Sequence, residues 1–222
     1  MKVGTDGVLL GAWSSVTDFP DSILDIGAGT GVVSLMLAQR SDALNIDAVE
    51  LDENAYEQTV ENFERSSWSD RLYCYHATFQ EFASEIAADE ETYDLIVSNP
   101  PFYTAGFETE NSARNKARST SFLSFEELVE GVVNIISKNG KFVVILPFLE
   151  ERNFISLAAK NNLFLNRVCR VQGNSLSEIK RTLLEFSLTK TNIKEEHLII
   201  ELSRHQYTEA YVNLTKDFYL KM

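Results

Sequence analysis

Residues 22–31 read Ser-Ile-Leu-Asp-Ile-Gly-Ala-Gly-Thr-Gly, a short apolar run that leads into three glycines at every second position. The apolar residues predict a buried strand, and the amphipathic segment Val32–Gln39 predicts a helix. Glycine permits positive φ and a close approach of a ligand to the backbone. The stretch therefore predicts a strand, a tight turn and a helix, with a ligand cradle at the carboxyl end of the strand.

The same alternation of apolar runs and amphipathic segments extends from this stretch to residue 146. Strands are predicted at Ile23–Ile26, Asn45–Glu50, Leu72–Tyr75, Leu95–Ser98 and Lys141–Leu146. Helices are predicted at Val32–Gln39, Ala55–Arg65, Phe79–Ile86 and Phe125–Ser137. Such alternation is typical of βαβ units with right-handed crossovers, so we expect a doubly wound α/β fold with a mostly parallel sheet.

The last third of the chain follows a different pattern. A helix is predicted at Glu150–Lys160, and the strand-like runs Leu163–Val171 and Thr182–Thr189 are close enough to pair antiparallel. A short strand is predicted at Leu198–Leu202, and the aromatic residues of Tyr207–Leu220 predict a tail that docks on the domain. We therefore expect an antiparallel edge strand on the parallel sheet.

Length and composition favour a single domain spanning residues 1–222, since 222 residues with 44% hydrophobic content suffice for one α/β core. Within it we distinguish an N-terminal segment and helix (1–20), a ligand-binding core (21–147) and C-terminal strands with a docking tail (148–222). No apolar run is long enough for a membrane span and no signal peptide is recognisable, so we expect a cytoplasmic protein.

Cysteine and histidine usage favours neither disulfides nor metal binding. The two cysteines lack CxxC spacing and the three histidines are scattered, so we expect reduced thiols and no bound metal. The net charge of −13 argues against nonspecific binding of nucleic acid along the whole surface. It does not exclude a local basic patch, such as the run that contains Arg114, Lys116 and Arg118, although such a charge run can also be a merely solvated face.

The glycine turn is better suited to a cationic ligand than to a phosphate. Asp25 lies just before the turn, where its carboxylate would repel phosphate, and no Gly-Lys-Ser/Thr sequence of a P-loop follows. Glu50 ends the next predicted strand, about 20 residues beyond the turn, where an acid can bind ribose hydroxyls. In these features the chain resembles the class I S-adenosylmethionine-dependent methyltransferases.

This resemblance implies a Rossmann-like, seven-stranded sheet and S-adenosylmethionine as the cofactor. It implies that Gly27, Gly29 and Gly31 admit the amino-acid part of the cofactor, with Asp25 nearby and Glu50 on the ribose.

The predicted contact with the adenine of the cofactor departs from the usual pattern. Such enzymes often carry an acidic residue after the third strand, whereas this chain has Thr78. A threonine hydroxyl accepts hydrogen bonds more weakly than a carboxylate does. We assign the adenine contact to Thr78, with Phe79 packing on the ring.

The sequence Asn99-Pro100-Pro101-Phe102 follows the fourth predicted strand. Each proline restricts the residue before it to an extended conformation, so Asn99 is presented rigidly at the strand end. The amide oxygen of Asn99 and the carbonyl of Pro100 can accept the two N–H bonds of an amine, and Phe102 can stack on a base. The motif predicts an amino-methyltransferase, with Asn99, Pro100 and Phe102 as catalytic residues.

Three further stretches carry a closer resemblance: Met1–Trp13, Asn111–Thr120 and Tyr207–Lys221. Together with the Asn-Pro-Pro-Phe motif, they make the chain similar to the bacterial family that methylates adenine N6 at position 37 of valine tRNA. The resemblance covers nearly the whole chain. It implies an enzyme that acts on the anticodon loop, with Arg114, Lys116 and Arg118 on tRNA phosphates. It also implies that Lys2, Thr5 and Asp6 lie near the cofactor. We separately expect a monomer.

Two departures from that family bear on the expectations. Many relatives carry tyrosine where this chain has Phe102. Most also have a segment upstream of the Lys-Val-Gly-Thr-Asp stretch, so we expect a chain that is truncated or starts at an internal methionine. Other acceptors stay open: guanine N2 of ribosomal RNA and the N5 amide of a protein glutamine. A cofactor-binding protein without catalysis is a further alternative, as is a nucleotide-binding oxidoreductase, which Asp25 and the glycine spacing disfavour.

Overall fold

The glycine-containing stretch forms strand β1 (Ser22–Ile26), a turn, and helix α2 (Val32–Arg40), as its pattern predicts. The computed structural model describes residues 4–100 and 123–220. Each glycine of the turn has positive φ: 73° at Gly27, 63° at Gly29 and 73° at Gly31. The turn therefore uses the backbone freedom that only glycine has at low cost.

The predicted alternation of strands and helices is confirmed along the first two thirds of the described chain. Helix α1 (Thr5–Trp13) precedes β1. After α2 the elements are β2 (Asn45–Glu50), α3 (Glu53–Glu64), β3 (Leu72–His76), α4 (Phe79–Ala88), β4 (Tyr93–Ser98), α6 (Phe125–Ile135) and β5 (Ile136–Pro147).

The C-terminal part contributes mainly antiparallel pairs. Its elements are the 3-10 helix η1 (Phe148–Glu150), α7 (Glu151–Lys160), β6 (Phe164–Asn174), β7 (Ile179–Ser187), β8 (Lys194–Ser203), β9 (Gln206–Tyr207), α8 (Glu209–Thr215) and the 3-10 helix η2 (Lys216–Phe218). The predicted pairing of two C-terminal strands is confirmed, since β6 and β7 are antiparallel neighbours.

Among the described residues, one sheet has the strand order β3-β2-β1-β4-β5-β7-β6-β8-β9. The expectation of seven strands is wrong in number: the sheet has nine. The difference arises because β8 adds parallel to β6, and the short β9 then pairs back onto β8. The expected mixed sheet is confirmed, with β1 to β5 parallel and β7 antiparallel to both of its neighbours.

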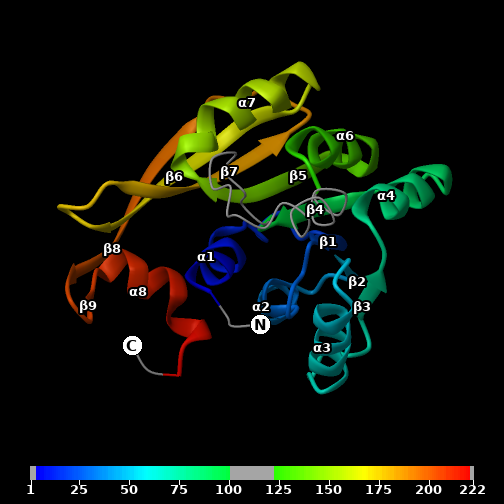
Figure 1. Ribbon diagram of the computed structural model, residues 1–222, viewed down its shortest axis with the longest axis horizontal. Helices are drawn as coiled ribbons and strands as arrows, with labels where there is room; N and C mark the ends of the chain where they lie inside the picture. Colours follow the sequence, from blue (N-terminus) through cyan, green and yellow to red (C-terminus); the bar gives the residue numbers. More distant parts are fainter. Residues whose placement is uncertain (1–3, 101–122, 221–222) are drawn as a thin grey trace, which may run out of the picture.

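Helices cover both faces of the sheet, as a doubly wound fold requires (Figure 1). One face packs against α1, α2, α3 and α8, and its core includes Leu10, Leu37 and Phe63. The opposite face packs against α4, α6 and α7, and its core includes Val129 and Phe154. The predicted docking of the C-terminal tail is confirmed, because Tyr211 of α8 is buried in the first of these cores.

Three further observations concern the cysteines, membrane-spanning helices and metal-binding groups. Cys74 and Cys169 are both free thiols. Within residues 4–100 and 123–220, no helix combines the length and the apolar character needed to cross a membrane. In the same residues, no group of three or more histidine, cysteine, aspartate or glutamate side chains could hold a metal ion.

Candidate active site

Three strand ends meet at the centre of the sheet. Ile26, the last residue of β1, pairs with Val49 of β2 on one side and with Ser98 of β4 on the other. Gly27, Glu50 and Asn99 follow these residues, so all three lie at the carboxyl edge of the sheet. The strand order reverses between β1 and β4, which is the switch point where ligands bind in open α/β sheets.

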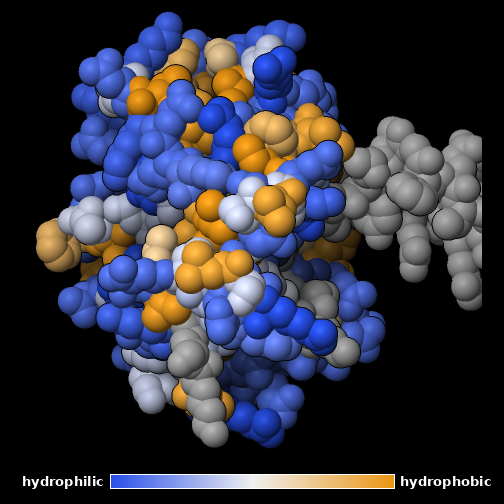
Figure 2. All heavy atoms as spheres, turned by 90° about the vertical axis from the view of Figure 1, so that its left-hand side faces the viewer, coloured by the Kyte–Doolittle hydropathy of each residue, from blue (hydrophilic) through white to orange (hydrophobic). Residues whose placement is uncertain are grey.

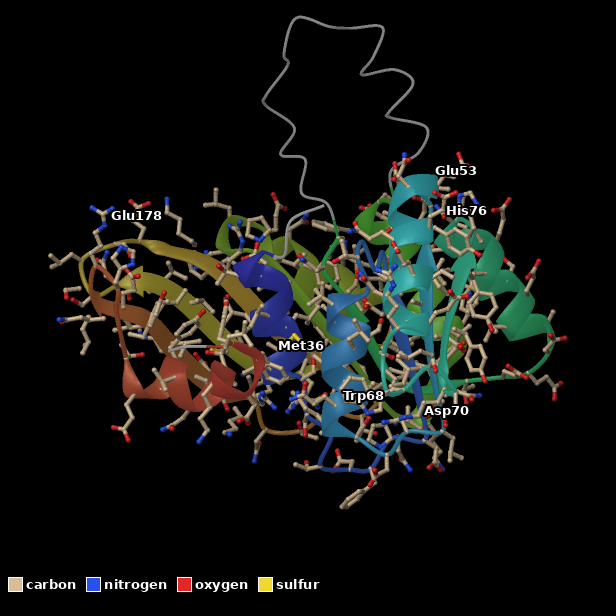
Figure 3. All side chains as sticks on the ribbon, turned by 90° about the horizontal axis from the view of Figure 1, so that it is seen from below. Met36, Glu53, Trp68, Asp70, His76 and Glu178 are labelled. Carbon is tan, nitrogen blue, oxygen red and sulfur yellow. The ribbon has the colours of Figure 1, made fainter. Side chains whose placement is uncertain are left out.

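Figure 3 shows the carboxyl ends and the amino ends of the parallel strands on opposite sides of the molecule. Glu53, which begins α3, and His76, which ends β3, lie on the side of the carboxyl edge. Trp68 and Asp70, which precede β3, lie on the opposite side. The candidate site therefore belongs to the upper side of that view.

The glycine turn is hydrogen-bonded to the end of β2. The backbone N–H groups of Gly27 and Ala28 both donate to the carbonyl of Val49, at 2.9 and 3.2 Å. A Cβ added at Gly27 would meet no protein atom within 4 Å. A Cβ added at Gly31 would instead lie 2.6 Å from the ring of Phe63. Gly27 thus borders open space that a ligand can enter, while Gly31 allows α3 to pack closely on the turn.

Glu50 is held at the rim of this space. Its carboxylate accepts the N–H of Gly29 through Oε2 and the N–H of Asp52 through Oε1, both at 2.8 Å. A carboxylate has about four acceptor positions, so two such bonds leave capacity for hydroxyl groups. The geometry fits the predicted role of Glu50 toward a ribose.

Asp25 lies beneath the turn and is only 2% exposed. The backbone N–H and the hydroxyl of Ser34 both donate to its Oδ2, at 3.2 and 2.7 Å. Burial raises the pKa of the Asp25 carboxyl from its ordinary 3.8 to about 6, against the opposing effect of the Ser34 bonds, and the charge of Glu50 adds to the rise. The structure therefore gives Asp25 a direct bond to the first turn of α2.

Helix α3 supplies two supports for the turn that the sequence pattern did not indicate. The hydroxyl of Thr59 donates to the carbonyl of Gly29, and the side-chain amide of Asn62 donates to the carbonyl of Thr30, both at 2.9 Å. Their spacing of three residues places them on one helix face. That spacing could have indicated a shared partner, but it does not say which loop the partner belongs to.

The end of β4 presents Asn99 beside the turn. The buried Ser98 donates its hydroxyl to the carbonyl of Ile26 at 3.0 Å, which ties β4 to β1 immediately before the two strand ends. Asn99 is partly exposed and Pro100 is buried. Of the other predicted site residues, Lys2, Phe102, Arg114, Lys116 and Arg118 lie outside the described residues.

The first turn of α1 also lies near the site. A Cβ added at Gly7 would be 3.5 Å from Val32, the first residue of α2, so α1 begins beside the glycine turn. Thr5 is exposed. The Asp6 carboxylate accepts a hydrogen bond from Arg181 Nε of β7 at 2.7 Å. The structure thus joins this segment to the far half of the sheet.

The two residues predicted to contact adenine have structural roles here. Thr78 is the N-cap of α4, and its hydroxyl bonds with both the backbone N–H and the carboxylate of Glu81. Phe79 is 5% exposed and packs where a Cβ at Gly131 of α6 would be only 2.4 Å from its ring. The geometry brings Glu50 and Asn99 together at the glycine turn, and it places the Phe79 ring in the core.

The sequence also matches known proteins. Residues 8–155 match the family described as "Methyltransferase small domain". A protein of Christiangramia forsetii named tRNA1(Val) (adenine(37)-N6)-methyltransferase is 54% identical over 222 residues, which are 100% of this chain and 92% of that protein. A protein of the same name from Bacteroides fragilis is 44% identical over 222 residues, with 100% and 92% coverage.

Solved structures match the fold. A predicted O-methyltransferase from Agrobacterium tumefaciens has a TM-score of 0.70 at 17% identity, with 96% of each chain covered. A ribosomal protein L11 methylase from Lactobacillus delbrueckii has a TM-score of 0.55 at 13% identity, covering 82% of this chain and 76% of that one. These similarities confirm the Rossmann-like methyltransferase fold.

Proposed function

Because the chain belongs to the tRNA1(Val) (adenine(37)-N6)-methyltransferase family, we propose that it methylates the N6 amine of an adenine in tRNA. The adenine at position 37 of valine tRNA, in the anticodon loop, is the proposed target. The observation that carries the proposal is the register of β1 with β4, which puts Asn99 beside the glycine turn. We further propose that the enzyme acts as a monomer in the cytoplasm.

S-adenosylmethionine fits the residues at the centre of the carboxyl edge. The open space beside Gly27 admits a ligand close to the backbone, and Glu50 has remaining acceptor capacity for ribose hydroxyls. Asp25 shapes the turn through Ser34 and adds a carboxylate below it, which suits a cationic ligand better than a phosphate. When bound, this cofactor supplies a methyl group on a positively charged sulfur.

The protein contributes orientation more than acid or base chemistry. The Asn99 side-chain oxygen and the Pro100 carbonyl accept the two N–H bonds of the adenine amine, which favours a nitrogen whose lone pair points toward the methyl group. This amine is a weak nucleophile because its lone pair is delocalised into the ring. Correct placement with fixed dipoles therefore supplies the main part of the rate enhancement. The amine loses its proton to water after transfer.

Recognition of the RNA is proposed to involve four residues that follow β4 in the sequence. Phe102 is proposed to stack on the target base, and Arg114, Lys116 and Arg118 are proposed to bind phosphates. All four lie outside the described residues. A base in an anticodon loop needs little unpairing before it enters a pocket.

The experiment is methyl transfer from labelled S-adenosylmethionine to total tRNA from cells that lack this enzyme. Nucleoside mass spectrometry identifies the product, and fragment mapping locates it. We expect N6-methyladenosine in valine tRNA with the wild-type protein and none with Asn99→Ala. Methylated guanine in ribosomal RNA, or a methylated glutamine in a protein acceptor with unmodified tRNA, would refute the proposed acceptor.

A further inference from the structure

The two flanks of the candidate site carry opposite charge. The flank beyond β2 and β3 consists of α3 and of residues 79–91, which form α4 and the turn after it. Residues 53–64 and 79–91 contain no lysine or arginine. Glu53, Glu57 and Glu81 lie in the first halves of α3 and α4, toward the carboxyl edge, and all three are exposed. The remaining acidic residues of these segments follow as each helix leads back to the start of the next parallel strand. We call Glu53, Glu57 and Glu81 the acidic flank; their charges repel phosphate groups.

The opposite flank is formed by two strand connections that lie side by side. What we call the hairpin strip comprises residues 174–181, from the end of β6 to the start of β7, and residues 203–206, from the end of β8 to the start of β9. Asn174 pairs with Glu201 just before both connections, so the two tips are neighbours. Arg181 pairs with Pro147 at the end of β5, which places the strip at the carboxyl edge. Glu178 accordingly lies on the same side of the molecule as Glu53 and His76 (Figure 3).

The hairpin strip carries basic side chains that form no ion pair with the described residues. It contains Lys180, Arg181 and Arg204 against one acidic residue, Glu178. Arg181 is paired with Asp6. Lys180 and Arg204 are exposed and form no ion pair with any residue that the structure describes. Two positive charges at the edge of the site are therefore available to a ligand.

The surface around the strip combines free cations with exposed apolar side chains. Figure 2 looks onto the end of the molecule formed by β8, β9 and the β6–β7 connection, and its described surface mixes hydrophilic residues with several apolar areas. Leu176, within the strip, and Leu202, beside it, are exposed. The two cations, unpaired among the described residues, are the feature of this surface that phosphate groups can use.

The strip is close enough to the catalytic end of β4 to act on the same substrate. From β4 to β7 there are two strand spacings, or about 10 Å, and from β4 to β8 there are four, or about 19 Å. An RNA with one base at Asn99 must extend over one flank of the site. The acidic flank opposes this path, and the hairpin strip favours it.

We propose that the hairpin strip binds phosphates of the tRNA arm that carries the target adenine, with Lys180 and Arg204 as the contacting side chains. This inference rests on the proposed function. The acidic flank sets the direction in which the RNA leaves the site. The contacts are separate from those proposed for Arg114, Lys116 and Arg118.

The test compares two double variants that remove the same charge. Lys180→Ala/Arg204→Ala alters the strip. Lys138→Ala/Lys160→Ala is the matched control, because both lysines are exposed, form no ion pair among the described residues, and lie near the start of β5 and at the end of α7, away from the carboxyl edge. Binding of unmodified tRNA is measured by fluorescence anisotropy at several salt concentrations, and binding of S-adenosylhomocysteine by calorimetry.

We expect the strip variant to bind tRNA about tenfold or more weakly at low salt, with the slope of log affinity against log salt reduced by about 1.4 to 1.8. The control variant should match the wild type, and both should bind S-adenosylhomocysteine normally. If the wild type methylates tRNA while the strip variant keeps the wild-type slope, the strip is not a phosphate site. If the wild type neither binds nor methylates tRNA, the proposed function itself is wrong and the strip proposal is overturned with it.

Discussion

Gly27 and Gly31 offer a paired test, because the same substitution should have different consequences at two positions of one turn. Both residues have φ of 73°, so alanine at either site costs about 1–2 kcal/mol for the left-handed conformation. At Gly31 the new methyl would also lie 2.6 Å from the Phe63 ring and 2.9 Å from Thr59 Cγ2. Both neighbours are buried, so overpacking adds about 1–3 kcal/mol.

The expected loss in free energy of unfolding is therefore about 2–5 kcal/mol for Gly31→Ala and about 1–2 kcal/mol for Gly27→Ala. Urea titration followed by circular dichroism measures both. Affinity for S-adenosylhomocysteine should separate the variants further, since the methyl at Gly27 projects into space that is free of protein atoms within 4 Å. Gly27→Ala should weaken this affinity while leaving the protein folded. Equal destabilisation by the two variants would refute the close packing of Phe63 on Gly31, and unchanged affinity in Gly27→Ala would refute the assignment of the space beside Gly27 to the cofactor.

Three other substitutions test the roles of single side chains. Asn99→Ala should lower kcat by about 100-fold or more while the calorimetric affinity for S-adenosylhomocysteine stays near that of the wild type; loss of cofactor binding would show that Asn99 holds the cofactor. For Asp25, the pKa is raised from 3.8 to about 6, so the folded state binds more protons than the unfolded state between these values, and wild-type stability should fall as pH rises through this range. Asp25→Asn should remove that part of the pH dependence, and parallel unfolding curves for the two proteins from pH 4 to 7 would contradict the assignment. Thr59→Ala should cost about 1–3 kcal/mol by leaving the Gly29 carbonyl without its partner, whereas Thr59→Ser should recover most of the loss in the same urea assay.

The strand ends were predictable because they depend on order along the chain. Alternating patterns gave the parallel strands, and the position of Asn99 after the fourth strand, with Glu50 after the second, follows from the topology of such sheets. The structure confirms the strands. The contributions of these two side chains to binding and catalysis stay predictions.

Tertiary partners were less predictable. The bonds of Thr59 and Asn62 to the glycine turn require knowing which loop α3 meets, and a helical pattern carries no such information. Phe79 illustrates the same limit, since an aromatic residue after a strand looks alike in sequence whether its ring faces a ligand or fills the space above Gly131. The sheet exceeds the seven strands implied by the resemblance because β8, predicted only as the short strand Leu198–Leu202, pairs with β6, and the two-residue β9 pairs with β8.

The insertion of β7 between β5 and β6 has a consequence for how the chain folds during synthesis. Until Ser187 has been made, β5 has no neighbour on one side, although its residues Phe142 to Leu146 are fully buried in the finished protein. The roughly 40 residues from Pro147 to Ser187 take about 2–8 s at typical ribosomal rates. For that interval the nascent chain displays an apolar edge strand, which is a template for aggregation. Slow translation between these two residues would prolong the exposure, so the fold favours continuous synthesis, or a chaperone, at this stage.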